Sequence, residues 1–256
     1  MSSAWRSTYS GREHSKARAV PLRSMGNYTY LALDLLSIAF PLLASFEPRI
    51  AFWRKWHALL PGIMVMALVF IPWDIAFTAQ GSWGFNDRYL LGARVAGLPL
   101  EEWLFFLMIP YACMFLYEVM RHFVKRNVLG KAARPVAMIL AVLLAIIGLL
   151  HIDHAYTAIT FLGTALYLAL HVLLWKSAWL GRFFIGYGIS LIPFFLVNGL
   201  LTGTWLEEPV VWYNDLENLG VRMGTIPVED SIYLLWMLLI VTHVYETRLK
   251  RDHGEP

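Results

Sequence analysis

Long apolar runs recur along this 256-residue chain, and they constrain its fold more than any other feature. An apolar run of about 18 residues or more is long enough to cross a bilayer as a helix. Hydrophobic residues make up 58% of the chain and charged residues only 15%, whereas a soluble domain has about a quarter charged. The sequence therefore predicts an all-α fold, a polytopic membrane helical bundle with about seven transmembrane helices. The predicted spans are 27–46, 57–79, 99–121, 136–151, 155–175, 182–202 and 227–246.

The distribution of lysine and arginine between the links predicts the orientation of these spans. The links after the second, fourth and sixth spans hold only Arg88, Arg94 and Arg222. The links after the first, third and fifth spans, with the C-terminus, are basic: Arg49, Arg54, Lys55, Arg121, Lys125, Arg126, Lys131, Arg134, Lys176, Arg182, Arg248, Lys250 and Arg251. Because basic links stay on the inner side, we predict an integral protein of the cell (cytoplasmic) membrane with a cytoplasmic C-terminus.

The two ends of the chain are polar. Residues 1–24 are basic and contain no apolar core of their own, which a secretory signal would need, so we predict a disordered tail there. Met25 stands directly before the first apolar run, and a native start at this residue is a hypothesis. Residues 251–256 are predicted to form a short polar tail.

The chain contains an internal repeat with an offset of 128 residues. Phe85-Asn86-Asp87 falls on Tyr213-Asn214-Asp215, and Tyr117-Glu118 falls on Tyr245-Glu246. We therefore predict two parallel three-helix repeats joined by a linker helix. The halves are expected at 25–126 and 155–250, with the linker helix at 127–154. Parallel repeats usually pack around an axis along the membrane normal and leave a site between them.

Both halves begin their third span with a proline and two adjacent acids. The motifs are Pro99-Leu100-Glu101-Glu102 and Pro227-Val228-Glu229-Asp230. Proline suits the first turn of a helix and acids suit its positive dipole end, so a single copy is as well explained by helix capping as by function. Two copies in matching surroundings favour a functional role.

Three more polar residues lie within or near the ends of apolar spans, where an unpaired carboxylate costs several kcal/mol. Asp34 and Asn198 are interpreted as hydrogen-bond partners between helices. Asp74 stands beside the first acidic motif, and for this residue function and structure are equally good interpretations. Aromatic residues crowd the same membrane edge, as they do in an interfacial belt. Those that share a helix face with the acids could instead steady a cation.

Several classes of function lack their sequence signals. No basic stripe is interleaved with aromatics, so the net charge of +3 does not indicate nucleic-acid binding. No GxGxxG, P-loop or GxSxG motif is present, and we predict no cofactor. The segment 151–154 (HIDH) lacks a third ligand at helical spacing and is interpreted as an interfacial turn, not a metal site. Cys113, the single cysteine, is interpreted as a packing residue.

Taken together, the motifs resemble the heterodimer-type lycopene cyclases of carotenoid synthesis. The resemblance rests on Pro72-Trp73-Asp74, Gly81-Ser82-Trp83-Gly84-Phe85-Asn86 and Pro99-Leu100-Glu101-Glu102-Trp103-Leu104-Phe105-Phe106. In that family two three-span subunits, or two fused halves, make one enzyme. The second half here, with Asn198-Gly199-Leu200-Leu201-Thr202 and the second acidic motif, looks like the partner subunit. The chain is thus similar to the fused form from about Asn27 to Glu246.

The resemblance implies a substrate, a reaction and a set of site residues. The substrate would be lycopene or a related carotenoid in the lipid bilayer, and contact with other carotenoid-synthesis enzymes is expected. Linear ψ end groups would close to β-ionone rings, giving γ-carotene and β-carotene, through a carbocation and without net redox change. The candidate catalytic residues are Glu101, Glu102, Glu229, Asp230 and Asp74. The candidate substrate-binding residues are Trp73, Trp83, Phe85, Asn86, Phe105, Phe106, Asn198, Tyr213, Asn214, Tyr233 and Trp236.

Two alternatives stay open on the sequence alone. A cyclase for C50 chains or ε rings would carry the same motifs, because the type of ring depends on which proton is removed. A small membrane transporter or lipid-binding protein would also carry acids within its spans, but a transporter predicts a polar path through both leaflets. The acids of this chain instead cluster near one membrane edge.

Overall fold

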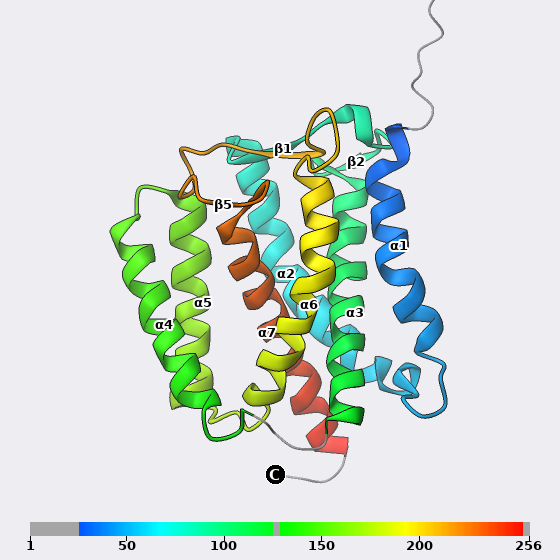
Figure 1. Cartoon of the computed structure of the whole chain (residues 1–256), viewed down its shortest axis with the longest axis vertical. Coiled ribbons are helices and arrows are strands. Elements are labelled where there is room, and N and C mark those ends of the chain that lie inside the picture. The colour runs from blue at the N-terminus through cyan, green and yellow to red at the C-terminus, as the bar shows by residue number, and fades with distance from the viewer. Residues whose placement is uncertain (1–25, 125–128, 253–256) are drawn as a thin grey trace, which may run out of the picture.

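The computed structural model describes residues 26–124 and 129–252, and within these ranges the chain folds as an all-α bundle (Figure 1). The long helices are α1 (Thr29–Ala44), α2 (Trp56–Gln80), α3 (Leu100–Phe123), α4 (Ala133–Leu150), α5 (Ala155–Leu173), α6 (Leu180–Leu201) and α7 (Val228–Asp252). Helical turns η1 (Gly26–Tyr28), η2 (Phe52–Lys55) and η3 (Asp87–Tyr89) lie between them or at their ends. The predicted tail over 1–24 lies outside the described residues.

In the described part of the chain, seven helices are long and apolar enough to cross a membrane, which confirms the predicted number of spans. Their ends match the predicted spans to within a few residues, except that α7 continues to Asp252 beyond the predicted end at residue 246. The extra turns are polar and carry Lys250 and Arg251. Basic side chains there stabilise the negative end of the helix dipole. A prediction based on apolar residues alone does not detect such polar helical turns.

Three short antiparallel strand pairs, which the sequence did not predict, lie at one end of the bundle (Figure 1). The pairs are β1 (Trp83–Phe85) with β4 (Val211–Tyr213), β2 (Arg94–Val95) with β3 (Leu98–Pro99), and β5 (Arg222–Met223) with β6 (Ile226–Pro227). In the first pair Trp83 lies opposite Tyr213 and Phe85 lies opposite Val211. This pair therefore joins the two halves of the chain across what we call the strand-bearing end.

The other two strand pairs are hairpins that repeat one another at the 128-residue offset. Arg94 lies opposite Pro99 in the first hairpin, and Arg222 lies opposite Pro227 in the second. Each arginine also binds an acid seven residues earlier in the chain, at 2.7 Å in the first half and 2.5 Å in the second. The repeat seen in the sequence is thus a repeat of backbone and side-chain contacts.

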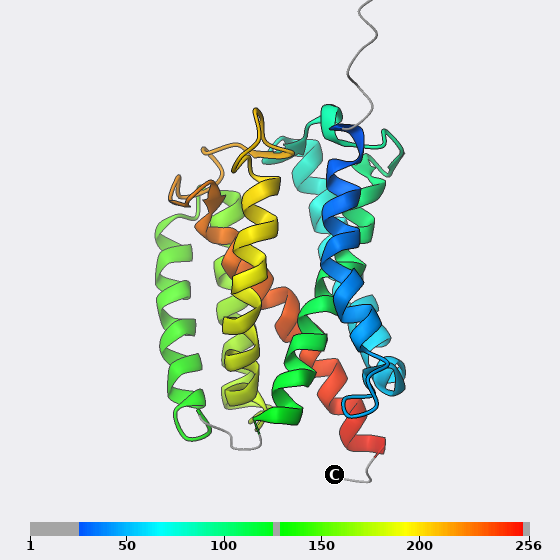
Figure 2. The same cartoon turned by 45° about the vertical axis from the view of Figure 1, so that its right-hand side comes forward.

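The helices of the two halves interleave. α2 packs against α7 and α3 packs against α6, so the second helix of each half lies on the third helix of the other. Figure 2 shows α1 and α6 at the front of the bundle with α7 crossing behind them. α4 lies outermost and packs chiefly on α5, as expected of a linker helix between two halves.

A reciprocal pair of hydrogen bonds links α3 and α7 at the end opposite the strands. The Tyr117 hydroxyl donates to Glu246 at 2.6 Å, and the Tyr245 hydroxyl donates to Glu118 at 2.5 Å. Lys55 adds an ion pair to Glu118, which is 3% exposed. We call these two hydrogen bonds the Tyr–Glu latch. Because each half supplies one donor and one acceptor, the latch reflects the twofold relation between the halves.

Candidate active site

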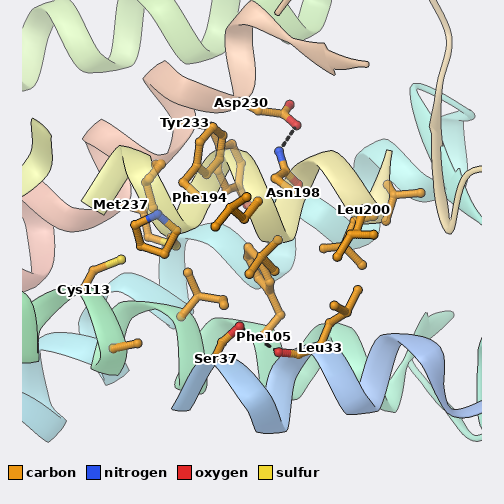
Figure 3. Close-up of a pocket in the computed structure, with 18 of the residues that line it drawn as sticks. Leu33, Ser37, Phe105, Cys113, Phe194, Asn198, Leu200, Asp230, Tyr233 and Met237 are labelled. Atoms are coloured by element: carbon orange, nitrogen blue, oxygen red, sulfur yellow. Dashed lines mark hydrogen bonds between the residues drawn. The ribbon is translucent and has the colours of Figure 1, made fainter. Parts of the chain in front are cut away.

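A cavity of about 500 Å³ lies between the two halves. Figure 3 shows Ser37 and Phe105, from α1 and α3, on one side of it, with Phe194 and Tyr233, from α6 and α7, on the other. Most of its lining is aliphatic or aromatic. Its carboxylate groups lie toward the strand-bearing end. An apolar cavity with a few convergent polar groups is the usual form of a binding site for an apolar ligand.

Three of the five predicted catalytic acids line this cavity: Asp74, Glu102 and Asp230. Asp74 comes from the last turns of α2, while Glu102 and Asp230 occupy equivalent positions in the first turns of α3 and α7. All three are nearly fully buried. The acids that the repeat relates to each other, Glu102 and Asp230, therefore serve one shared cavity.

Glu102 and Asp74 form a pair within the first half. The Tyr30 hydroxyl donates to Oε2 of Glu102 at 2.5 Å, and the Trp83 indole N–H donates to Oδ1 of Asp74 at 2.6 Å. The two carboxyl groups line the same cavity and are close enough to interact electrostatically. Neither carboxylate has a donor when ionised, so a hydrogen bond between them requires that one of them hold a proton.

Asp230 has a different environment, because three neutral donors point at its carboxylate. The Tyr156 hydroxyl donates to Oδ1 at 2.7 Å, while Asn198 Nδ2 and the Tyr213 hydroxyl donate to Oδ2 at 2.7 and 2.9 Å (Figure 3 shows the Asn198 contact). Hydrogen bonds to a carboxylate favour its charged form. In β4, burial and the neighbouring Asp230 carboxylate raise the pKa of Tyr213 well above its usual value, so its phenol remains a donor.

The other acid of each motif points away from the cavity. Oε1 of Glu101 accepts the backbone N–H of Leu91 at 2.6 Å, and Oε1 of Glu229 accepts that of Leu219 at 2.8 Å. Glu229 also accepts the hydroxyl of Thr157 at 2.6 Å. Both glutamates are fully buried and neither lines the cavity. Their equivalent contacts hold each hairpin loop on the helix that follows it.

Six of the predicted substrate-binding residues line the cavity: Trp83, Phe85, Phe105, Asn198, Tyr213 and Tyr233. The others lie elsewhere. Asn86 and Asn214 accept backbone N–H groups two residues further on, at 3.1 Å, and so shape equivalent turns. Phe106 is buried in the main core. Trp73 and Trp236 pack against each other, with ring centroids 5.7 Å apart.

Two tyrosines at the site were missed by the sequence analysis. Tyr30 and Tyr156 come from the first helix of each half, and each donates to the cavity-facing acid of its own half. Tyr156 aligns with Tyr28 in the repeat, two residues from Tyr30, so this near match was a usable signal. Cys113, interpreted as a packing residue, is buried and also lines the cavity (Figure 3).

The two predicted helix-to-helix hydrogen bonds differ in outcome. Asn198 of α6 does bind Asp230 of α7. The prediction for Asp34 is wrong, because this residue of α1 is 1% exposed and neither carboxylate oxygen has a partner among the described residues. Its neighbours along that stretch of α1 are apolar, and sequence does not reveal which helix faces a buried side chain.

Among the described residues, no cluster of three or more His, Cys, Asp or Glu is arranged to hold a metal ion.

A family model described as Lycopene cyclase matches residues 27–120 and 153–247 of this chain. The two matched segments contain both acidic motifs and most of the cavity lining. The chain belongs to the lycopene cyclase family. Comparisons with curated proteins and with solved structures gave no significant match. The two matches to one family model agree with a lycopene cyclase in which two repeated halves are fused.

The lining and the surroundings of the cavity suit the kind of substrate that a lycopene cyclase acts on. A carotenoid is an apolar molecule that resides in the bilayer, and the described part of the chain has seven helices long and apolar enough to cross that bilayer. The cavity is apolar along most of its length and carries carboxyl groups at one end. Both family-matched halves contribute walls to it, so neither half contains the complete site.

Proposed function

We propose that this cyclase closes a linear ψ end group of lycopene to a β-ionone ring by acid/base catalysis. The observation that carries the proposal is the convergence of Asp74, Glu102 and Asp230, from both halves, at one end of an apolar cavity in a membrane bundle. The reaction adds a proton at the terminal double bond, forms a carbon–carbon bond to close the ring, and removes a proton from a neighbouring ring carbon. Atoms and electrons balance without a cofactor.

The pair formed by Glu102 and Asp74 is assigned as the acid. Both carboxyl groups are buried and interact with each other, and Oδ2 of Asp74 has no hydrogen-bond partner among the described residues, so we assign one shared proton to the pair. Two neighbouring carboxyl groups in a buried site do not both ionise easily, because their negative charges repel each other. This repulsion keeps a proton on the pair. That proton is delivered to the terminal double bond of the end group.

Asp230 is assigned as the group that stabilises the carbocation and accepts the departing proton. Its three donors favour the carboxylate form, in contrast to the proton-sharing pair across the cavity. A fixed negative charge near a developing cation lowers the barrier most in a site that excludes water. The faces of Trp83, Phe105 and Tyr233 add cation–π stabilisation around the same end of the cavity.

Glu101 and Glu229 are assigned as positioning residues. Each orders the hairpin loop that precedes its own helix, and the cavity-facing acid is the next residue along that helix. Consecutive residues on a helix point about 100° apart, so one acid of each motif can hold the loop while the other faces the substrate. The two adjacent acids of each motif therefore have different roles, one in positioning the loop and one in the cavity.

We further propose that the strand-bearing end faces the outer side of the cell membrane and that the C-terminus is cytoplasmic. The described arginines of the strand-bearing end are few and are paired with acids, as in Arg94 with Asp87. The opposite end carries the denser set of lysines and arginines, which favours the inner side. A C-terminal reporter that is active only in the cytoplasm tests this orientation.

The test of the function is pigment analysis in a bacterial host that accumulates lycopene and expresses residues 25–256. We expect carotenes with one or two β rings, identified by chromatography and absorption spectra, and loss of this conversion in Asp230→Asn. Unchanged lycopene, with the wild-type protein shown in the membrane fraction, would overturn the proposal. The same assay with a linear C50 carotenoid would then examine the related cyclase activity.

A further inference from the structure

The mouth of the cavity lies between α1 and α6. Leu36 and Phe40 of α1 line the cavity, yet 72% and 70% of their surface is exposed on the outside of the bundle. Leu196 of α6 lines it as well and is 57% exposed. In a membrane-spanning bundle this exposed apolar surface contacts lipid. The opening is therefore lateral, into the bilayer, and lies toward the middle of the helices.

The cavity is shorter than the proposed substrate. Its lining runs from Tyr30 to Pro41 on α1 and from Glu102 to Leu116 on α3, which is about 16–21 Å at the helical rise. A linear C40 polyene is longer than the ~30 Å hydrocarbon core of a bilayer. An end group beside Asp230 therefore leaves a large part of the polyene outside the cavity.

The equivalent region on the other side of the bundle is filled by aromatic side chains. Phe70 occupies the position that corresponds to Asn198, and its ring lies 4.8 Å from Tyr233 and 5.3 Å from Trp236. Gly163 of α5 lies so close to Trp236 that a Cβ there would collide with the indole ring. The repeat therefore does not provide a matching second cavity for the far end of the same polyene.

We propose that the polyene enters sideways from the bilayer between α1 and α6, and that the cavity holds one end group with the adjoining part of the chain. The distal part stays in the lipid during ring closure. This inference rests on the proposed cyclase function. A second ring on the same molecule then requires withdrawal and re-entry of the other end, so the one-ring product is free in the bilayer between the two events.

Covalent blocking of the mouth tests the route of entry. Leu36→Cys is made in a Cys113→Ala background and treated in liposomes with a bulky, lipid-soluble maleimide, and each sample is compared with its own unlabelled form. The control is Leu43→Cys in the same background, because Leu43 lies two turns further along α1, is 75% exposed and does not line the cavity. We expect labelling to lower conversion at least about tenfold, or 1.4 kcal/mol, at position 36 and to leave it unchanged at position 43.

The outcomes separate this inference from the proposed function. If complete labelling at position 36 leaves conversion unchanged, lateral entry at this mouth is wrong while the cyclase function stands. If labelling at both positions lowers conversion equally, the route of entry is also refuted, because the loss is not specific to the mouth. If neither unlabelled protein nor wild type converts lycopene, the proposed function itself fails.

A substrate with a bulky distal end tests how much of the polyene is held. We expect a C40 carotenoid with one linear end and one glycosylated ring to be cyclised at its linear end within about threefold of the rate for lycopene, which is less than 1 kcal/mol. The matched control carries the same glycosylated ring on a polyene without a linear end group. It should compete with lycopene for the cavity without being converted. A loss of more than tenfold for the first substrate would show that the distal end must also be enclosed.

Discussion

If Glu102 and Asp74 share one proton, replacing either should remove the acid, and replacing both should cost little more than one. Glu102→Gln and Asp74→Asn keep the shape of each side chain but cannot deliver a proton from a carboxyl group. General acid catalysis contributes about 10²–10⁴-fold, or about 3–5 kcal/mol, so each variant should lose conversion in that range. Residues that act as a unit are strongly non-additive, so we expect the double variant to equal the worse single variant.

The assay is single-turnover conversion of lycopene in liposomes, with protein content and folding checked for each variant. Glu101→Gln is the matched control, because Glu101 is the adjacent acid and does not line the cavity. It should retain most of the chemical rate and lose about 1–3 kcal/mol of stability, since the new amide N–H would be buried without a partner. If the losses of the single variants multiply in the double variant, or if Glu101→Gln is as slow as Glu102→Gln, the shared-proton assignment is refuted.

Three further predictions concern the contacts around this site and the latch. Asn198→Leu should slow single-turnover conversion about 10–100-fold, because a hydrogen bond to the charged Asp230 is worth about 1.5–3 kcal/mol. Tyr117→Phe and Tyr245→Phe should each lower the free energy of unfolding, measured by denaturant titration, by a similar amount, about 1–3 kcal/mol, with an unchanged pigment profile; unequal losses would contradict the symmetry of the latch. The raised pKa of Tyr213 stabilises the fold below the ordinary tyrosine pKa near 10. That contribution is lost as pH rises further, and Tyr213→Phe should make stability above pH ~10 less dependent on pH.

The sequence predicted those features that depend on long or repeated patterns. Long apolar runs indicated seven membrane-spanning helices because a helix satisfies the polar N–H and C=O groups of its own backbone within the lipid. The repeat was visible because polar residues such as Asn86 and Asn214 recur at a fixed offset. The structure explains their recurrence, since both accept a backbone N–H in equivalent turns. The strand pairs were missed because two or three residues give no periodic signal.

The sequence could not separate the acids within each motif. Glu101 and Glu102 are both glutamates, adjacent and near a helix start, yet only the second faces the cavity. Helix geometry alone requires that they point in different directions, but the choice between them depends on where α1 and α6 pack. The same limit explains Trp73 and Trp236, which were candidate substrate contacts because of their types and positions. They pack against each other instead, through an inter-half contact that no local pattern encodes.

The twofold relation explains why a duplicated chain makes one site. The paired strands β1 and β4 cross between the halves at Gly84 and Trp212, so the approximate axis passes beside them. Side chains close to such an axis meet their own counterparts, and Glu102 and Asp230 accordingly line a common cavity. Because both acids line one cavity, equivalent positions on the two sides of the axis can carry different residues. Asn198 on one side orients Asp230, and Phe70 in the corresponding position fills space. Equivalent positions in the two halves thus have different roles: Asn198 supports the Asp230 carboxylate in one half, and Phe70 fills the corresponding region in the other.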